Sequence, residues 1–496
     1  MPHPPAPLLD LLEADMSPEA GSRFVALVAG YFAATRSGEG PVSTASSAAE
    51  LAARFAAAPP EQPRPLEEVV AALRDLVVPD ANHLWHPRYV GHQVSSPLPA
   101  AVWADALVSA LNQSVAVWEM SPVATVIETR LIRWFCDLVG YGPEAGGTLT
   151  TGGTEATFSA LLAARSAAIP DVWERGVGAD PPVIVCGEHA HYAVTRAAGQ
   201  LGLGMGRVVV VPSRDWRMDV SVLSRSLDGI AADGRSVMAV VATAGSTATG
   251  SFDDLETIGA LCEERGLWLH VDAAHGGSAI LAPAHAHRLR GLRRARSIAW
   301  DPHKMMLLPL QVGMLLVRDE RALEAAFAQR APYLFHRSAG APGPQPDAPA
   351  RVVDQGIRSF LCSRRADALK LWVALERYGS AGIGALYEHL CARTADFHDM
   401  IAARPTFETI HAPESNILCF RWVGNGSMSP EALDDANLRL RERLNQSGLG
   451  WITTNLLGGR RVLRVTIMNP RTTGEHLAAI LDGLQALATE TAEAAT

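Results

Sequence analysis

Two residues that could do covalent and acid–base chemistry stand just after apolar segments of the chain. Lys304 is flanked by His303 and by the apolar run 305–308, so its surroundings should be dry. A desolvated amine loses its proton more easily and can then form a Schiff base with an aldehyde. Asp272 ends another apolar run, where a carboxylate needs a cation or hydrogen-bond donors, and a protonated pyridine nitrogen would serve. Taken singly, a surface lysine and a helix cap are the ordinary interpretations.

Three further polar positions also follow strand-like segments. Gly152, Gly153 and Thr154 precede a helix-forming run, where free backbone N–H groups and a hydroxyl could hold a phosphate. His191 follows another apolar segment, and Thr243 stands at the end of the next one. A glycine pair is usually a plain turn and such a histidine is usually structural. Five such features in this placement are nevertheless improbable by chance, so together they predict a functional site.

The elements that would position these residues are short β-branched segments that alternate with helix-length amphipathic stretches. Because the segments are almost wholly apolar, they predict a parallel sheet covered on both faces. Ligands bind such doubly wound sheets at the carboxyl ends of the strands, where the polar positions lie. The segments cover residues 183–186, 207–212, 237–244, 267–274, 297–300 and 312–317.

The pattern divides the 496-residue chain into three parts. We expect an N-terminal helical segment over 1–75, a large α/β domain over 76–378 and a small C-terminal α+β domain over 379–496. The strand-like segments 416–422 and 461–467 characterise the small domain, and the pattern predicts a helix over 363–379.

Composition excludes several classes of protein. With 48% hydrophobic and 19% charged residues the chain is not disordered, and no apolar stretch approaches the roughly 20 residues of a membrane span. A net charge of −9 argues against nucleic-acid and anionic-membrane partners, and the arginine-rich run 288–296 is expected to be a solvated helix face. Six cysteines without CxxC or zinc-site spacing indicate a reducing compartment and no metal site. Since the first residues also lack the pattern of a signal peptide, we expect a cytoplasmic protein.

The combined motifs resemble the group II pyridoxal-phosphate-dependent decarboxylases, which act on glutamate, cysteine sulfinate, aromatic amino acids and diaminobutyrate. The similarity runs from about His86 to Pro470. It implies the type I fold of pyridoxal-phosphate enzymes (aspartate-aminotransferase-like), pyridoxal 5'-phosphate as cofactor and a homodimer. The implied reaction converts an L-amino acid to the amine and CO2 through an external aldimine and a quinonoid. The motifs are Gly152-Gly153-Thr154, His191-Tyr192, 243–247, 270–274 and Asp301-Pro302-His303-Lys304.

The same resemblance implies roles for individual residues. Lys304 would carry the Schiff base, Asp272 would pair with the pyridine nitrogen, and His191 would stack on the ring and help place the substrate carboxylate. Asp301 stands where many members have asparagine; a carboxylate cannot donate to a phosphate, which argues against direct contact between them. The remaining implied cofactor-binding residues are Gly153, Thr154, Thr243, Ala274 and His303.

Within the family, the glutamate and cysteine-sulfinate branch is the most similar. Arg464 matches an arginine that binds a substrate carboxylate there, and Gln93 is a looser match to a substrate-contacting glutamine. A structural salt bridge is the alternative for Arg464. The sequence leaves the identity of the amino-acid substrate open. The matching segments are 86–96, 118–122, 331–335, 361–372 and 463–470.

One departure keeps alternatives open. In this family a mobile loop carries a tyrosine that returns a proton after CO2 leaves, but no tyrosine occurs between Tyr333 and Tyr378. Decarboxylation to the amine is favoured, with oxidative deamination to an aldehyde, or another reaction at Cα, as the alternative. A third possibility is a cofactor-binding protein without catalysis. We also expect the stretch around 336–356 to close over the site.

Overall fold

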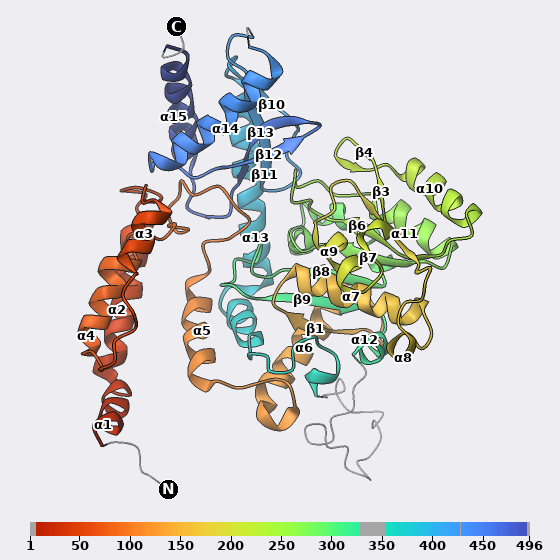
Figure 1. The fold of residues 1–496 in the computed structure, drawn as a ribbon, viewed down its shortest axis with the longest axis horizontal. Helices are drawn as coiled ribbons and strands as arrows, with labels where there is room; N and C mark the ends of the chain where they lie inside the picture. Colours follow the sequence, from red (N-terminus) through yellow and green to blue (C-terminus); the bar gives the residue numbers. More distant parts are fainter. Residues whose placement is uncertain (1–5, 328–353, 427, 494–496) are drawn as a thin grey trace. The chain divides into compact units, whose positions relative to one another are not determined.

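The computed structural model describes residues 6–327, 354–426 and 428–493, and it divides into two compact units (Figure 1). The larger unit comprises Gln93–Ala395 and His411–Leu418. The smaller unit comprises Met1–His92, Asp396–Ile410 and Cys419–Thr496. The three-part division expected from the sequence stays a prediction.

A seven-stranded sheet in the order β1-β9-β8-β7-β6-β2-β3 forms the centre of the larger unit. Strands β3, β2, β6, β7 and β8 run parallel, whereas β9 is antiparallel to both of its neighbours. Every residue of β2, β7, β8 and β9 is buried, as a sheet covered on both faces requires. The mainly parallel sheet predicted from the sequence is confirmed. The strands are β1 (Gly146–Thr150), β2 (Val183–Gly187), β3 (Val208–Val211), β6 (Val237–Thr243), β7 (Trp268–Asp272), β8 (Ser297–Trp300) and β9 (Gly313–Val317).

Helices pack against this sheet. The helix α7 lies across β6 to β9, and its face of small residues lets it approach the strands closely; Ala156 and Ala160 are fully buried there. The helices of the larger unit, before the last one, are α5 (Pro99–Leu111), α6 (Pro122–Val139), α7 (Gly153–Ala168), α8 (Val172–Arg175), α9 (Ala193–Gln200), α10 (Val220–Ala232), α11 (Leu255–Glu264) and α12 (Arg321–Ala326). A small hairpin joins β4 (Ser213–Arg214) to β5 (Arg217–Met218).

Two helix predictions need correction. The helix predicted over 363–379 begins only at Ala368, because the backbone of Arg364 and Arg365 pairs instead with the segment 114–115. The resulting helix, α13 (Ala368–Ala402), is interrupted at Gly379, whose φ of +67° suits glycine. The run 288–296 is not one solvated helix face: it contains short 3₁₀ turns, and two of its arginines form ion pairs with glutamates.

The smaller unit combines helices with a four-stranded sheet of order β10-β11-β13-β12. Three of its helices begin at serine side chains that accept a backbone N–H, as capping serines do. Its helices are α1 (Ala6–Asp15), α2 (Pro18–Arg36), α3 (Ala48–Arg54), α4 (Leu66–Ala72), α14 (Pro430–Gln446) and α15 (Gly474–Glu493). The strands of its sheet are β10 (Phe407–Thr409), β11 (Ile417–Trp422), β12 (Thr453–Leu457) and β13 (Arg460–Thr466).

Short irregular helices occur in both units, at Leu73–Val77, Trp118–Met120, Met205–Arg207, Gly277–Leu281, Ala286–Leu289, Leu292–Arg294 and Gln355–Ile357. Among the helices of the described ranges, none combines the length and the apolar character needed to cross a membrane.

Candidate active site

The carboxyl ends of neighbouring strands meet around a cavity of about 440 Å³ in the larger unit. That volume is in the range of small-molecule and cofactor sites. Residues that follow β1, β2, β6, β7 and β8 line it, because parallel strands bring their carboxyl ends to one edge of the sheet. All eight residues predicted for cofactor binding or catalysis lie on this cavity: Gly153, Thr154, His191, Thr243, Asp272, Ala274, His303 and Lys304.

The turn from β1 into α7 has the form of an anion-binding site. Gly152 has a φ of +152°, which side chains rarely adopt, and a β-carbon on Gly153 would lie 2.8 Å from that of Ala274. The first N–H groups of α7 lack acceptors within the helix and stay available to a ligand. The carboxylate of Glu155 accepts hydrogen bonds from the N–H and hydroxyl of Thr151, at 2.9 and 2.7 Å. The two glycines lack side chains and the carboxylate of Glu155 is held by Thr151, so a preformed space remains at the helix N-terminus.

The chain contains two lysines, and one of them lies on the cavity. Lys370 is fully buried beside Asp367, with 2.9 Å between its Nζ and the carboxylate. Lys304 has a 19% exposed side chain, and its Nζ lies 3.0 Å from Oδ2 of Asp301. The run 305–308 is buried, as expected from the sequence. The amine itself is paired with a carboxylate and reaches the cavity.

Asp301 is a buried acid with basic neighbours. It is 2% exposed. In addition to the Nζ of Lys304, the Nε2 of His303 lies near its Oδ2, at 3.5 Å. Its other oxygen, Oδ1, has no hydrogen-bond partner among the residues that the structure describes. The two basic neighbours, Lys304 and His303, therefore explain why a carboxylate is tolerated at this buried position.

Asp272 combines a structural contact with a free acceptor. Its Oδ1 accepts a hydrogen bond from the N–H of Ala274 at 3.1 Å, so it caps the turn after β7. Within the described ranges no hydrogen bond engages its second oxygen, although the residue lines the cavity. The ordinary cap interpretation is therefore correct in part, and one carboxylate oxygen remains for a ligand.

Two of the three cavity histidines, His191 and His303, have defined proton positions. Burial lowers the pKa of both His191 and His303, so each imidazole is neutral near pH 7. Nδ1 of His191 accepts the N–H of Ala193 at 3.3 Å, and Nδ1 of His303 accepts the N–H of Val312 at 3.1 Å. The single proton of each ring must then lie on Nε2. Each histidine therefore presents an N–H donor.

These residues fit pyridoxal phosphate. The glycine turn suits a phosphate, the carboxylate of Asp272 suits a protonated ring nitrogen, and Lys304 suits an aldehyde. In addition, Oγ1 of Thr243 is buried without a hydrogen-bond partner in the described part of the chain, although it lies at the cavity. An orphaned hydroxyl is costly unless a ligand satisfies it.

The two predicted substrate residues lie elsewhere. Gln93 belongs to the larger unit, but it is not among the residues that line the cavity. Arg464 belongs to the smaller unit and is 7% exposed on β13; one nitrogen lies 3.4 Å from Oγ1 of Thr453. Its Nε and one NH2 group have no hydrogen-bond partner in the described ranges, and burial lowers its pKa. The salt-bridge alternative for Arg464 is wrong within those ranges.

Some cavity residues were not predicted. His275 directly follows the motif at 270–274, and Glu155 follows the glycine pair by two residues, so both had a signal in their spacing. Leu310 and Gln311 had none, because they lie in an irregular segment between β8 and β9. The residues missed are Thr151, Glu155, His275, Leu310 and Gln311.

Comparison with known proteins identifies the class. The fold and the cavity are those of an enzyme that uses pyridoxal phosphate at the carboxyl ends of a mainly parallel sheet. A model of the pyridoxal-dependent decarboxylase conserved domain matches residues 49–423, more than half of the chain. The chain therefore belongs to the pyridoxal-dependent decarboxylase family.

Individual relatives agree with this. The L-2,4-diaminobutyrate decarboxylase of Rhizobium meliloti is 34% identical over 434 residues, which cover 86% of this chain and 84% of the relative. The cysteine sulfinic acid decarboxylase of Rattus norvegicus is 33% identical over 397 residues, 78% of each chain. Among solved structures, mouse CSAD has a TM-score of 0.86 and 29% identity over 95% of this chain and 99% of its own.

Several expectations from the sequence are thereby confirmed. The protein has the type I fold of pyridoxal-phosphate enzymes, with a mainly parallel large sheet and a small C-terminal domain. It is a pyridoxal-phosphate-dependent carboxy-lyase that removes the α-carboxyl group of an amino acid. Oxidative deamination is not favoured by these relatives, which are decarboxylases.

A buried histidine on β7, two residues before Asp272, predicts that the folded protein loses stability in acid. His270 on β7 is fully buried, burial lowers its pKa to about 4, and its Nδ1 lies 2.9 Å from the hydroxyl of Ser297. Because the unfolded chain binds this proton near pH 6.5, the stabilisation is complete above that pH and is lost as pH falls toward 4. It amounts to roughly 3 kcal/mol.

Urea unfolding at several pH values measures this loss. His270→Asn is expected to flatten the profile between pH 6.5 and 4, whereas the matched change at the exposed His287 leaves it unaltered. An unchanged profile in His270→Asn would assign the acid sensitivity to other groups.

Proposed function

We propose that Lys304 bonds the cofactor covalently, that Asp272 pairs with its ring nitrogen and that the turn 152–154 binds its phosphate. The observation that carries this proposal is the position of Lys304. It is one of two lysines in the chain, and it lies on the cavity together with every other predicted cofactor residue. The other lysine, Lys370, is fully buried in ion pairs.

The remaining roles follow from the chemistry of each group. Pyridoxal phosphate, when bound, supplies an electron sink for the charge left at Cα by the departing CO2. Asp272 holds a proton at the ring nitrogen, since an anion there favours the protonated form. His191, neutral with its proton on Nε2, stacks as an uncharged ring and donates to a substrate carboxylate. Thr243, Ala274 and His303 complete the lining.

We infer further that Arg464 binds a substrate carboxylate. A buried guanidinium without an anion is costly, and a planar fork of donors suits a carboxylate held by two hydrogen bonds. A cation held on the departing α-carboxylate would stabilise the ground state and so oppose its loss. The better use of Arg464 is therefore on a side-chain carboxylate, which makes an acidic amino acid the proposed substrate. Gln93 is proposed as a second substrate contact.

Arg464→Lys tests this assignment. The lysine keeps the charge but cannot form the bidentate contact, so kcat/KM for the best acidic substrate should fall about 100-fold, about 2.7 kcal/mol. The exposed Arg460 of the same strand provides the matched control, Arg460→Lys, which should leave kcat/KM unchanged. An acidic substrate turned over equally well by Arg464→Lys, or a preference for diaminobutyrate, would exclude the proposed contact.

The proposed product is the amine, which requires that a residue return a proton after CO2 leaves. Residues 334–353 of the tyrosine-free stretch, and with them most of the lid expected around 336–356, lie outside the described residues. Tyr192 lines the cavity and is half exposed, which makes it the candidate donor among the residues in view.

A homodimer is proposed from an apolar surface on α5. Trp103, Leu107 and Leu111 recur at intervals of four residues, so they share one helix face, and all three are exposed. Exposed apolar faces of this kind mark protein interfaces. A second copy of this chain is the partner that the family resemblance implies.

Leu107→Glu should shift the mass in solution from dimer to monomer, measured by light scattering. Leu456→Glu is the control, because both leucines are 54% exposed and Leu456 lies on β12. A dimer that survives Leu107→Glu would place the interface on another surface.

Location in the cytoplasm is also proposed. None of the six cysteines, all of which lie in the described ranges, is joined in a disulfide bond, as expected for a reducing compartment.

A further inference from the structure

Strand β1 lies at the edge of the large sheet, and carboxylates cover its outer side near the site. It is the first strand in the sheet order, and β9 is its only strand neighbour in the described sheet. Edge strands leave alternate N–H groups unpaired. Here Oε1 of Glu128 accepts the N–H of Leu149 at 3.2 Å, and Oε2 of Glu155 accepts that of Thr151 at 2.9 Å. Two carboxylates thus hold the last residues before the phosphate turn.

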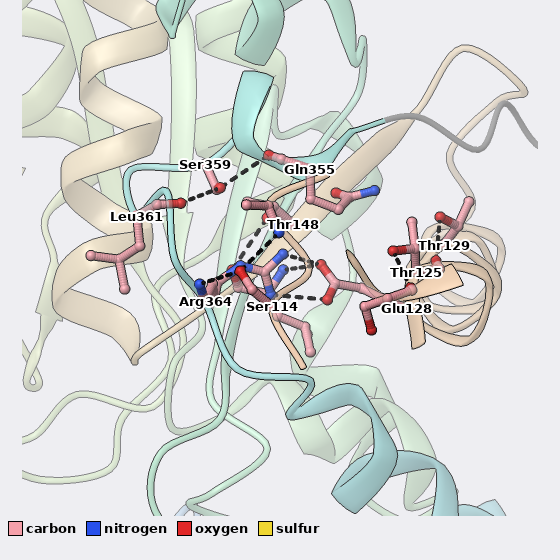
Figure 2. A network of polar contacts seen from close by, with 12 residues as sticks. Ser114, Thr125, Glu128, Thr129, Thr148, Gln355, Ser359, Leu361 and Arg364 are labelled. Carbon is pink, nitrogen blue, oxygen red and sulfur yellow. Dashed lines mark hydrogen bonds and ion pairs between the residues drawn. The ribbon is translucent and has the colours of Figure 1, made fainter. Parts of the chain in front are cut away.

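Glu128 is itself held by an arginine. Arg364 donates from NH1 to Oε2 of Glu128 at 2.9 Å and from NH2 to Oε1 at 2.7 Å. Figure 2 shows the two side chains facing one another, and both are almost fully buried. A bidentate pair fixes the plane of the carboxylate, so Oε1 is held where it meets Leu149.

Arg364 is in turn fixed by its backbone. Its carbonyl accepts the N–H of Val115 at 2.9 Å, and its N–H donates to Oγ of Ser114 at 3.4 Å. These contacts explain why the helix predicted to include Arg364 starts later. The guanidinium therefore reaches Glu128 from an anchored segment.

We propose that Glu128 and Arg364 are positioning residues for cofactor binding. The pair fixes the end of β1, which continues through Thr150 and Thr151 into the turn 152–154. A displacement of the strand end would move the N–H groups of that turn. This inference rests on the proposed function, which assigns the turn to the cofactor phosphate.

The geometry also predicts which residues of the site do not depend on the Glu128–Arg364 pair. Asp272 ends β7 and Lys304 follows β8, and β9 separates both of these strands from β1. Loss of the pair should therefore weaken cofactor binding and leave turnover at saturating cofactor nearly unchanged. A residue needed only for stability would not divide its effect in this way.

Glu128→Gln is the first test, because glutamine keeps the shape but has one oxygen and turns an NH2 group toward the donors of Arg364. The Kd of the cofactor-free protein for pyridoxal phosphate should rise at least about tenfold, about 1.4 kcal/mol. Hydrogen exchange of peptides covering 146–154 should become faster without cofactor. The kcat at saturating cofactor should stay within about twofold of the parent value.

A second buried arginine provides the matched control. Arg358 pairs with Glu320 and Glu324 at 2.9 Å each, and neither glutamate belongs to β1. Arg358→Met should lower thermal stability without raising the Kd or the exchange rate at 146–154. If Glu128→Gln does not fold, Arg364→Lys keeps the charge with a single donor group and should give a smaller change in the same direction.

Two results would overturn the proposal: an unchanged Kd with unchanged exchange in Glu128→Gln and Arg364→Lys, or an equal rise of Kd in Arg358→Met. Gly153→Ala separates this from a failure of the proposed function, because its β-carbon would fill the turn directly. A normal Kd in Gly153→Ala would refute the phosphate turn. A raised Kd there with a normal Kd in Glu128→Gln would refute only the positioning role.

Discussion

Lys304→Ala is expected to give a folded protein that no longer bonds pyridoxal phosphate and has lost at least about a thousandfold in turnover, about 4 kcal/mol of barrier. The amine is the nucleophile for the cofactor aldehyde, and the alanine removes it. Borohydride reduction followed by mass spectrometry should find the pyridoxyl group on Lys304 in the parent protein and nowhere in the variant.

Because the chain contains two lysines, the label can appear on only one lysine besides Lys304. Lys370 is the one alternative lysine, and Lys370→Arg should keep the label on Lys304. Label recovered on Lys370 in Lys304→Ala, with turnover intact, would show that the cofactor bonds a different residue.

Asp272→Asn should retain the fold and bind cofactor, yet lose at least about 100-fold in kcat, about 2.7 kcal/mol. The asparagine can still accept the N–H of Ala274, so the turn after β7 keeps its cap. What it loses is the charge that holds a proton on the ring nitrogen. Steady-state turnover at saturating cofactor measures the effect.

Asp254 supplies the control for this variant. It is an exposed aspartate that caps α11 by accepting the N–H of Thr257, and Asp254→Asn should leave kcat unaltered. Near-normal turnover in Asp272→Asn would mean that Asp272 is only a cap.

The sequence predicted the strands and the site together for one physical reason. Buried parallel strands are continuous apolar runs, so the polar residue that ends each run, such as Thr243 or Asp272, stands out from its surroundings. The topology then brings these ends to one edge. Lys304, Asp272, His191, Thr243 and the turn 152–154 were predicted in this way, whereas Ala274 and His303 were predicted only from the resemblance to the family.

Partners across the fold were not predictable by the same means. The contact of Asp301 with Lys304 depends on side-chain directions after β8, and the pairing of Arg364 with Glu128 joins residues 236 positions apart. The helix predicted over 363–379 was wrong at its start. Helix propensity favours the residues from 363 onward, but the backbone of Arg364 and Arg365 pairs instead with the segment 114–115. Leu310 and Gln311 line the cavity from a segment without a periodic pattern.

One measurement tests the central claim most directly. The purified protein, loaded with pyridoxal phosphate, is given a panel of L-amino acids that includes acidic ones and diaminobutyrate, and CO2, amine, aldehyde and ammonia are measured with and without oxygen. The account predicts CO2 and amine in equal amounts from an acidic amino acid, with yields that do not change when oxygen is removed. Aldehyde and ammonia formed with consumption of oxygen, or no CO2 from any member of the panel, would contradict it.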